Sequence, residues 1–129
     1  GVSAETDWDP TALAGGPKLL WSTNVGIGHS SVAIEGDVLY TMGSDEHGDS
    51  IFCLDADTGE KNWRTPVEGF GPNSTPTIDG DSLYCLGAEG DVYCLNRKNG
   101  KNRWKTNLVH DLGAEGIAYN FNYSPPCRV

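Results

Sequence analysis

One stretch of this chain is written nearly twice. The run IFCLDADTGEKNW ends at Trp63, and the similar run VYCLNRKNGKNRW ends at Trp104, 41 residues later. Trp21 closes an earlier copy, 42 residues before Trp63. A repeat of this period is one supersecondary unit, and such units must stack because a single one cannot bury its own apolar face. The repeat therefore excludes most folds before composition is considered.

Each unit has the pattern of short strands separated by turns. In the first unit, three β-branched and aromatic runs (SVAI, DVLYTM and SIFCL) are divided by Glu-Gly-Asp and His-Gly-Asp turns. A fourth strand is expected to begin near Lys61 and to carry Trp63. The two aligned units, residues 31–63 and 75–104, lack the 3.6-residue apolar spacing of helical solenoids, and they have neither the Gly-His start nor the Trp-Asp end of WD propellers. Four antiparallel strands in about 42 residues predict an all-β fold of β-propeller blades.

The repeat also predicts how the chain is divided. Residues 1–17 form an N-terminal extension, and residues 18–129 form a propeller segment. Two complete blades are expected at about residues 26–67 and 68–107, flanked by the last strand of an earlier blade (KLLWSTNV) and by the start of a third repeat. Eight such blades would need about 330 residues, so we expect a piece of a longer propeller. The alternative is a short chain that completes itself by oligomerising.

Charge and hydropathy narrow the choice of partners. Eighteen acidic residues against nine basic ones give a formal net charge of −9. Such a surface repels phosphate backbones and anionic lipids, so nucleic acid is not expected as a partner. No apolar run reaches the roughly 20 residues of a spanning helix, so direct membrane insertion is not expected either. The expected partners are other propeller blades, from the same chain or a homo-oligomer, and a protein or small-molecule ligand.

The four cysteines, Cys53, Cys85, Cys94 and Cys127, lack the spacing of a zinc site. Cys53 and Cys94 occupy the same place in the two copies and are expected to be small buried hydrophobes. The state of Cys85 depends on a hairpin register. One register places Cys85 opposite Cys94, where a cross-strand disulfide would fit, and another register separates the two residues.

The residues around the closing Trp resemble a known family. The run CLDADTGEKNW is similar to the tryptophan-docking repeat of the pyrroloquinoline-quinone (PQQ) type propellers, roughly Ala-x-Asp-x-x-x-Gly-x-x-x-Trp. The docking residues that this resemblance implies are Trp21, Asp55, Gly59, Trp63, Gly100 and Trp104. The second copy departs from the pattern, since Asn96 stands in the place of Asp55. The resemblance covers about residues 18–107 and implies a periplasmic or extracellular protein in which each Trp packs on the neighbouring blade.

The same resemblance implies two kinds of function. Its quinoprotein dehydrogenases carry a vicinal Cys-Cys pair, a Trp beneath the quinone, and Ca²⁺ ligands with an Asp base, none of which can be matched here. Its BamB-like members are non-catalytic. The sequence therefore favours a non-catalytic extracytoplasmic interaction module with no catalytic residue, metal or cofactor. The alternatives are a segment of a PQQ-dependent quinoprotein dehydrogenase, which would bring PQQ with Ca²⁺, and the extracellular sensor domain of a receptor.

Candidate ligand-binding residues lie on the loops that join each outer strand to the next inner strand, where propellers present their sites. Alignment of these loops places His29, Asn73 and Asn122 at equivalent points, with Tyr119 nearby. They are expected to form a polar arc at the mouth of the channel. The alternative is that they bond to the local turn backbone, as Asn often does. The acidic cluster SDEHGDS lacks the spacing of a Ca²⁺ loop and is interpreted as a hairpin tip.

Overall fold

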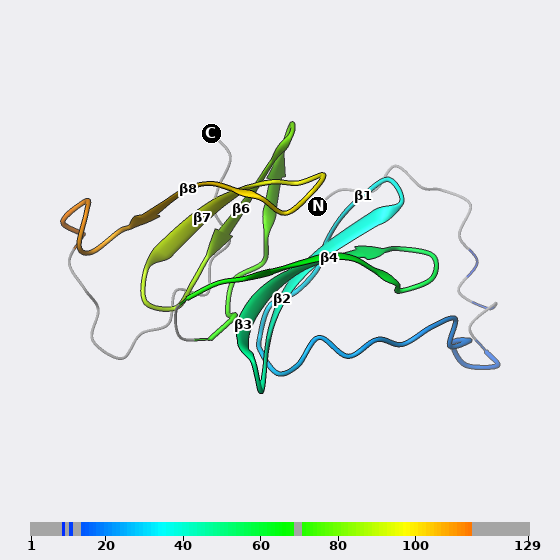
Figure 1. Cartoon of the computed structure of the whole chain (residues 1–129). Coiled ribbons are helices and arrows are strands. Elements are labelled where there is room, and N and C mark those ends of the chain that lie inside the picture. Colours follow the sequence, from blue (N-terminus) through cyan, green and yellow to red (C-terminus); the bar gives the residue numbers. More distant parts are fainter. Residues whose placement is uncertain (1–8, 10, 12–13, 69–70, 115–129) are drawn as a thin grey trace.

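The computed structural model describes residues 9, 11, 14–68 and 71–114, which contain two four-stranded antiparallel sheets. In each sheet the strands follow chain order, and Figure 1 shows the two sheets side by side. The strands of the first sheet, blade 1, are β1 (Ala33–Glu35), β2 (Val38–Asp45), β3 (Gly48–Asp55) and β4 (Lys61–Pro66). Those of the second, blade 2, are β5 (Thr77–Asp79), β6 (Ser82–Leu86), β7 (Asp91–Asn96) and β8 (Asn102–Asn107). The predicted all-β fold of propeller blades is confirmed.

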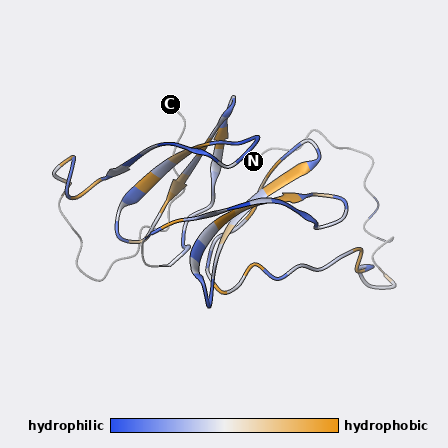
Figure 2. Cartoon of the chain, in the orientation of Figure 1, coloured by the Kyte–Doolittle hydropathy of each residue, from blue (hydrophilic) through white to orange (hydrophobic). Residues whose placement is uncertain are grey.

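The two middle strands of each sheet carry the core. β2 and β3 are apolar on both faces and almost continuously buried, whereas β1 and β4 at the edges are mainly exposed or half-buried. Figure 2 shows the same division, with apolar residues along the middle strands and hydrophilic residues at the turns. A strand covered on both faces needs an apolar run rather than alternation, which explains why IFCL and VYCL read as continuous runs.

The turns are short and use Gly where the backbone needs a positive φ. β1 and β2 pair Glu35 with Val38, which leaves a two-residue turn whose first residue, Gly36, has φ 63°. Gly80 stands in the same place in blade 2, with φ 54°. β-branched and most other side chains disfavour this region, so the Gly-Asp pairs fix where each hairpin turns.

Each blade has two different faces, and the core between the blades joins unlike ones. The back face of blade 1 is formed by Tyr40, Met42, Ile51, Cys53 and Trp63. The front face of blade 2 is formed by Leu83, Cys85, Tyr93 and Leu95, and the two faces pack into one apolar cluster. The front face of blade 1 (Leu39, Phe52 and Leu54) packs against Trp21 and Val25 from the segment before the first sheet. The blades therefore stack front to back.

The hairpin between β6 and β7 settles the register that the cysteine pattern left open. Cys85 pairs with Tyr93, and Cys94 pairs with Tyr84, so Cys85 and Cys94 point to opposite faces. Cys53, Cys85 and Cys94 are free thiols and buried. A cross-strand disulfide between Cys85 and Cys94 is therefore wrong for this structure. The cause is the turn, in which the Gly87 N–H donates to the Asp91 carbonyl oxygen at 2.8 Å.

One predicted strand does not form as a hydrogen-bonded strand. Residues 18–25 are extended and have alternating burial at Trp21, Thr23 and Val25, but they belong to no sheet. They lie on the front face of blade 1 through Trp21 and Val25. In the described part of the chain no other strand lies beside them, so their backbone has nothing with which to pair.

Candidate functional site

The antiparallel strands place the loops of both blades at two ends. One end, here called the loop end, holds the tip Glu46–His47, the segment after β4 and the tip Gly87–Gly90. The blades meet there because the hydroxyl of Tyr93 in β7 donates to the Glu68 carbonyl oxygen at 2.6 Å and accepts from the Glu68 N–H at 2.9 Å. The predicted ligand-binding loops reach this same end.

His29 and Asn73 come from neighbouring loops but differ in exposure. The His29 N–H donates to the Pro72 carbonyl oxygen at 2.9 Å, which joins the two loops. The side chain of His29 is exposed, whereas Asn73 is only 7% exposed. Asn122 and Tyr119, the other predicted members of the polar arc, lie outside the described residues. The proposal of a polar arc at the channel mouth therefore depends on His29 and on a third loop.

Two serines support these loops, and sequence reasoning did not find them. The Ser30 hydroxyl oxygen accepts from the Met42 N–H at 3.3 Å, and that of Ser74 accepts from the equivalent Leu86 N–H at the same distance. Ser74 also donates to the Leu86 carbonyl oxygen at 2.6 Å. Each serine thus fixes its loop to the second strand of its blade. The signal was present as the repeated small residue after His29 and Asn73 in HSS and NST.

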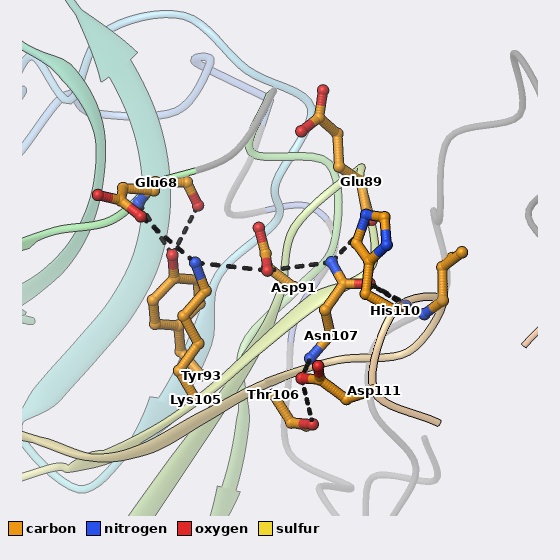
Figure 3. Close-up of polar contacts among 10 residues, drawn as sticks. Glu68, Glu89, Asp91, Tyr93, Lys105, Thr106, Asn107, His110 and Asp111 are labelled. Carbon is orange, nitrogen blue, oxygen red and sulfur yellow. Dashed lines mark hydrogen bonds and ion pairs between the residues drawn. The ribbon is translucent and has the colours of Figure 1, made fainter. Parts of the chain in front are cut away.

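A polar hollow of about 410 Å³ opens at the loop end of blade 2. Its lining comes from the tip before β7, from β8 and from the turn that follows it: Glu89, Asp91, Lys105, Thr106, Asn107, His110 and Asp111. Figure 3 shows these residues and Glu68 joined by a chain of polar contacts, in which Glu89 and His110 take part through backbone atoms. The sequence reasoning did not select this cluster, because its members have no recognised motif spacing.

Internal contacts engage Lys105 and Asp91 in this hollow. The Lys105 Nζ lies 3.4 Å from Asp91 Oδ1 and 3.5 Å from Glu68 Oε2, and 5.0 Å above the ring of Tyr93. Its hydrogen bond to Tyr93 is the first cause of a pKa raised above the ordinary lysine value, so Lys105 stays charged. Asp91 Oδ1 also accepts from the Asn107 amide at 3.1 Å. A group held charged in this way binds neighbouring carboxylates and does not act as a proton donor at neutral pH.

The turn after β8 is held by a second carboxylate. Asp111 Oδ2 accepts from the Asn107 N–H at 2.7 Å and from the Thr106 hydroxyl at 3.1 Å. The backbone hydrogen bond from Asn107, followed by that of Thr106, lowers the pKa of Asp111. The carboxylate therefore acts as an acceptor that shapes the turn.

The described residues do not fit PQQ with Ca²⁺. A calcium site needs six to eight oxygen ligands converging on one point. Among residues 14–68 and 71–114, no group of three or more His, Cys, Asp or Glu side chains is placed to hold a metal ion. Two carboxylates of the hollow are already engaged, that of Asp91 with Lys105 and the Asn107 amide and that of Asp111 with the Asn107 N–H. No helix in the described part is long and apolar enough to span a membrane.

The opposite end, here called the turn end, contains the best-defined contact between the blades. The Trp63 Nε1–H donates to the Arg97 carbonyl oxygen at 3.0 Å, and the Tyr40 hydroxyl donates to the same oxygen at 3.3 Å. Burial raises the pKa of Tyr40 to about 12, so its hydroxyl is a donor at neutral pH. The side chain of Arg97 forms an ion pair with Glu35 of blade 1. One backbone carbonyl of blade 2 thus receives two donors from blade 1.

A glycine makes room for each of the two docked tryptophans, Trp21 and Trp63. A Cβ on Gly100 would lie 2.6 Å from Trp63 Cε3, and a Cβ on Gly59 would lie 2.4 Å from Trp21 Cε3. Both glycines also have a positive φ, of 69° and 74°. Trp21 donates to the Ala56 carbonyl oxygen at 3.0 Å, in the manner of Trp63. Only Gly lets the indole ring lie this close to the turn.

The structure explains why Asn replaces Asp in the second copy. Asp55 Oδ1 accepts from the Asp57 N–H at 3.0 Å, and Asn96 Oδ1 accepts from the equivalent Lys98 N–H at 3.0 Å. Both side chains act through one oxygen atom on the same turn, so an amide serves as well as a carboxylate.

The third tryptophan, Trp104, is 45% exposed, with its ring 6.0 Å from that of Tyr84. The corresponding Tyr40–Trp63 distance is 5.9 Å.

Comparison with known proteins gives a family match and a set of similar folds. The family model described as outer membrane protein assembly factor BamB matches residues 11–118. Comparison with curated protein sequences gave no significant match.

Among solved structures, BamB from Moraxella catarrhalis is 21% identical over 70% of this chain and 28% of its own, with a TM-score of 0.60. A quinohemoprotein alcohol dehydrogenase from Pseudomonas putida HK5 is 16% identical over 73% of this chain and 15% of its own, also with a TM-score of 0.60. The computationally designed Ika4 protein is 12% identical over 67% of this chain and 52% of its own, with a TM-score of 0.53. At these identities the likeness concerns the fold, and the chain spans less than a third of the two natural relatives.

Proposed function

Because this chain belongs to the PQQ-like β-propeller family, whose matching model is described by the assembly factor BamB, we propose that it is a non-catalytic part of a protein-binding propeller. Its immediate role is to bind further blades at its exposed faces. The assembled propeller then presents its loop end to a protein partner outside the cytoplasm. The periplasmic or extracellular location rests on the family match alone.

The observation that carries this proposal is the back face of blade 2, where Trp104 is 45% exposed. Trp104, Tyr84 and Cys94 hold the positions that Trp63, Tyr40 and Cys53 hold on the back face of blade 1. The aromatic pair is already in the same arrangement, at 6.0 Å against 5.9 Å. A half-exposed Trp in the geometry of a docked one supports a surface built to receive a neighbouring blade.

The charge of the loop end supports a protein partner. Exposed acidic side chains at this end come from both blades and from the turns beyond them: Asp45, Glu46, Glu68, Glu89 and Asp111. Such a surface favours a basic protein surface and disfavours nucleic acid. A non-catalytic role is also supported by the hollow, because Asp91, Lys105 and Asp111 are engaged with neighbouring groups.

The test extends the chain by one blade. Residues 109–129 are replaced by a second copy of residues 68–107, so that Trp104 precedes the copy as Trp63 precedes blade 2. We expect hydrogen exchange of the Trp104 indole N–H, followed by NMR, to slow to the rate of the Trp63 indole. The reason is that the copied Arg97 carbonyl oxygen would accept the indole proton.

A matched control fills the space on the copied blade that the Trp104 indole would occupy. The same extended chain with Gly100→Ala in the copied blade should leave Trp104 in fast exchange, because the added methyl would collide with the indole. If Trp104 exchanges equally fast in the extended chain without this substitution, the back face does not receive a blade and the proposed role is wrong.

A further inference from the structure

The turn between β7 and β8 is the part of blade 2 that blade 1 holds most closely. Trp63 and Tyr40 donate to the Arg97 carbonyl oxygen. The Thr65 hydroxyl donates to the Gly100 carbonyl oxygen at 2.7 Å. A Cβ on Gly100 would lie 2.5 Å from the Thr65 hydroxyl oxygen and 2.6 Å from Trp63 Cε3. A change in the backbone at Gly100 therefore acts directly on the contact between the blades.

The residue before Gly100 makes this turn chemically labile. Asn99 and Gly100 form the only Asn-Gly pair in the sequence. The side-chain amide carbon of an asparagine is open to attack by the backbone nitrogen of the next residue, and glycine hinders that approach least because it has no side chain. Asn99 is exposed, and its Oδ1 accepts from the Lys101 N–H at 3.0 Å. This hydrogen bond draws electron density from the amide carbon and favours the attack.

One hydrogen bond opposes the reaction. The Gly100 N–H donates to the Asn96 carbonyl oxygen at 2.8 Å. This bond retains the proton that the nitrogen must lose, so the attack requires local opening of the turn. Openings of an exposed turn cost far less free energy than openings of a buried strand. The folded chain therefore reaches the reactive state without unfolding its core.

We propose that Asn99 and Gly100 form a site of spontaneous deamidation whose isoaspartate product loosens the contact between the blades. The Gly100 nitrogen loses its proton and bonds to Asn99 Cγ, and the side-chain nitrogen leaves as ammonia. Water then opens the cyclic imide. Breaking the new bond to Cγ gives aspartate, and breaking the original bond to the backbone carbonyl carbon gives isoaspartate, whose main chain runs through the former side chain.

The two products differ in what they do to the turn. Isoaspartate adds one carbon to the main chain just before Gly100, which displaces Gly100 from the Asn96 carbonyl and from Thr65. The indole of Trp63 lies too close to Gly100 for the turn to absorb this change in place. Aspartate keeps the length of the main chain. This inference goes beyond the proposed function, because it concerns the contact between the two described blades and needs no further blade or partner.

Blade 1 supplies the matched control. Thr58 stands before Gly59 where Asn99 stands before Gly100. The Thr58 hydroxyl donates to Asp55 Oδ1 at 2.9 Å, and Asn96 offers an oxygen at the equivalent place in blade 2. Asn99→Thr should therefore keep the turn and remove the reactive amide. Asn99→Asp reproduces the product that keeps the main-chain length.

The test follows the reaction and its effect in the folded chain. The chain is kept at mildly alkaline pH, well below its unfolding transition, and every asparagine is followed by peptide mapping with mass spectrometry. We expect Asn99 to lose its amide at least ~10-fold faster than any other asparagine, because it alone precedes a glycine. The isoaspartate fraction is then isolated, and hydrogen exchange of the Trp63 indole N–H is measured by NMR. We expect this exchange to be at least ~10-fold faster than in the fresh chain.

The variants separate the causes. Fresh Asn99→Asp and incubated Asn99→Thr should both keep the slow Trp63 exchange of the fresh chain. Loss of the amide from Asn99 no faster than from other asparagines overturns the proposal, and so does slow Trp63 exchange in the isoaspartate fraction. Fast exchange in Asn99→Asp also overturns it, because the new charge and not the lengthened main chain would then be the cause. Accelerated exchange in incubated Asn99→Thr would place the change elsewhere in the chain and would overturn it as well.

Discussion

At the scale of single residues, the contact between the blades depends on a few polar atoms set into an apolar interface. Trp63 contributes both a large ring and one N–H, and the ring lies against Gly100 while the N–H reaches the Arg97 carbonyl oxygen. The carbonyl is a better target than a side chain, because its position is fixed by the turn whatever residue follows the motif. For this reason the residue type at the accepting position can change: Trp21 donates to the carbonyl oxygen of Ala56 in blade 1, and Trp63 donates to that of Arg97 in blade 2.

Removing the Trp63 ring tests how much it contributes to stability. Trp63→Ala should lower the free energy of unfolding by about 3–5 kcal/mol, the range for deleting a large packed aromatic side chain. Trp104→Ala is the matched control and should cost less than half as much, because Trp104 is 45% exposed and no blade among the described residues lies against it. Chemical denaturation of both variants measures the difference. Equal losses would mean that Trp63 acts within its own sheet and not across the interface.

At the scale of elements, the repeat made the strands predictable and left their hydrogen bonding partly open. The apolar runs gave β1 to β4 and their order, since Gly-Asp turns separate them. β2 continues past the predicted end to Asp45 because Asp45 pairs with Gly48 and leaves only Glu46 and His47 in the tip. No local signal could give that register.

The site was less predictable than the strands. Asn73 was placed on the correct loop, but its burial depends on packing between loops that lie far apart in the sequence. The contact of Tyr93 with Glu68 joins residues 25 positions apart and has no motif. The residues that sequence reasoning found were those that recur in every repeat, because recurrence is visible in one chain and a single contact between two blades is not.

The turn before the last strand of each blade gives a prediction at this scale. Gly100→Ala places a methyl group against Trp63 in a backbone with φ 69°, whereas Gly80→Ala meets nothing within 4 Å at φ 54°. In both variants the positive φ strains the new alanine, which should lower the free energy of unfolding by about 1 kcal/mol. Only Gly100→Ala should also displace the indole, so its total loss in free energy of unfolding should be roughly 3 kcal/mol. Thermal unfolding of the two variants separates these causes, and equal shifts in Tm would remove the steric role of Gly100.

At the scale of the whole molecule, the two blades share one core. Four side chains from the back of blade 1 and four from the front of blade 2 make up the buried cluster. The other cluster, on the front face of blade 1, has only three buried members: Leu39, Phe52 and Leu54. Stability in such a stack is a sum of unit and interface terms, and here the interface term is large.

The shared core predicts that the blades unfold together. Leu83 is fully buried in the cluster, so Leu83→Ala should lower the free energy of unfolding by about 2–5 kcal/mol. We expect calorimetry to show one transition in both the unmodified chain and the variant, at a lower Tm in the variant. Amide exchange should accelerate in blade 1 as well as in blade 2. Acceleration confined to blade 2 would show that the blades open independently.

The front-to-back contact also gives the stack a direction. Trp63 of one blade reaches the turn of the next, and no described contact runs the other way with the same residues. An interface between two unlike surfaces rotates each added blade by the same angle. A series of such blades therefore either closes into a ring or continues as an open helix. The rotation between neighbouring blades, which the Trp63 contact helps to fix, therefore determines how many blades a closed ring contains. That number is 360° divided by the rotation per blade.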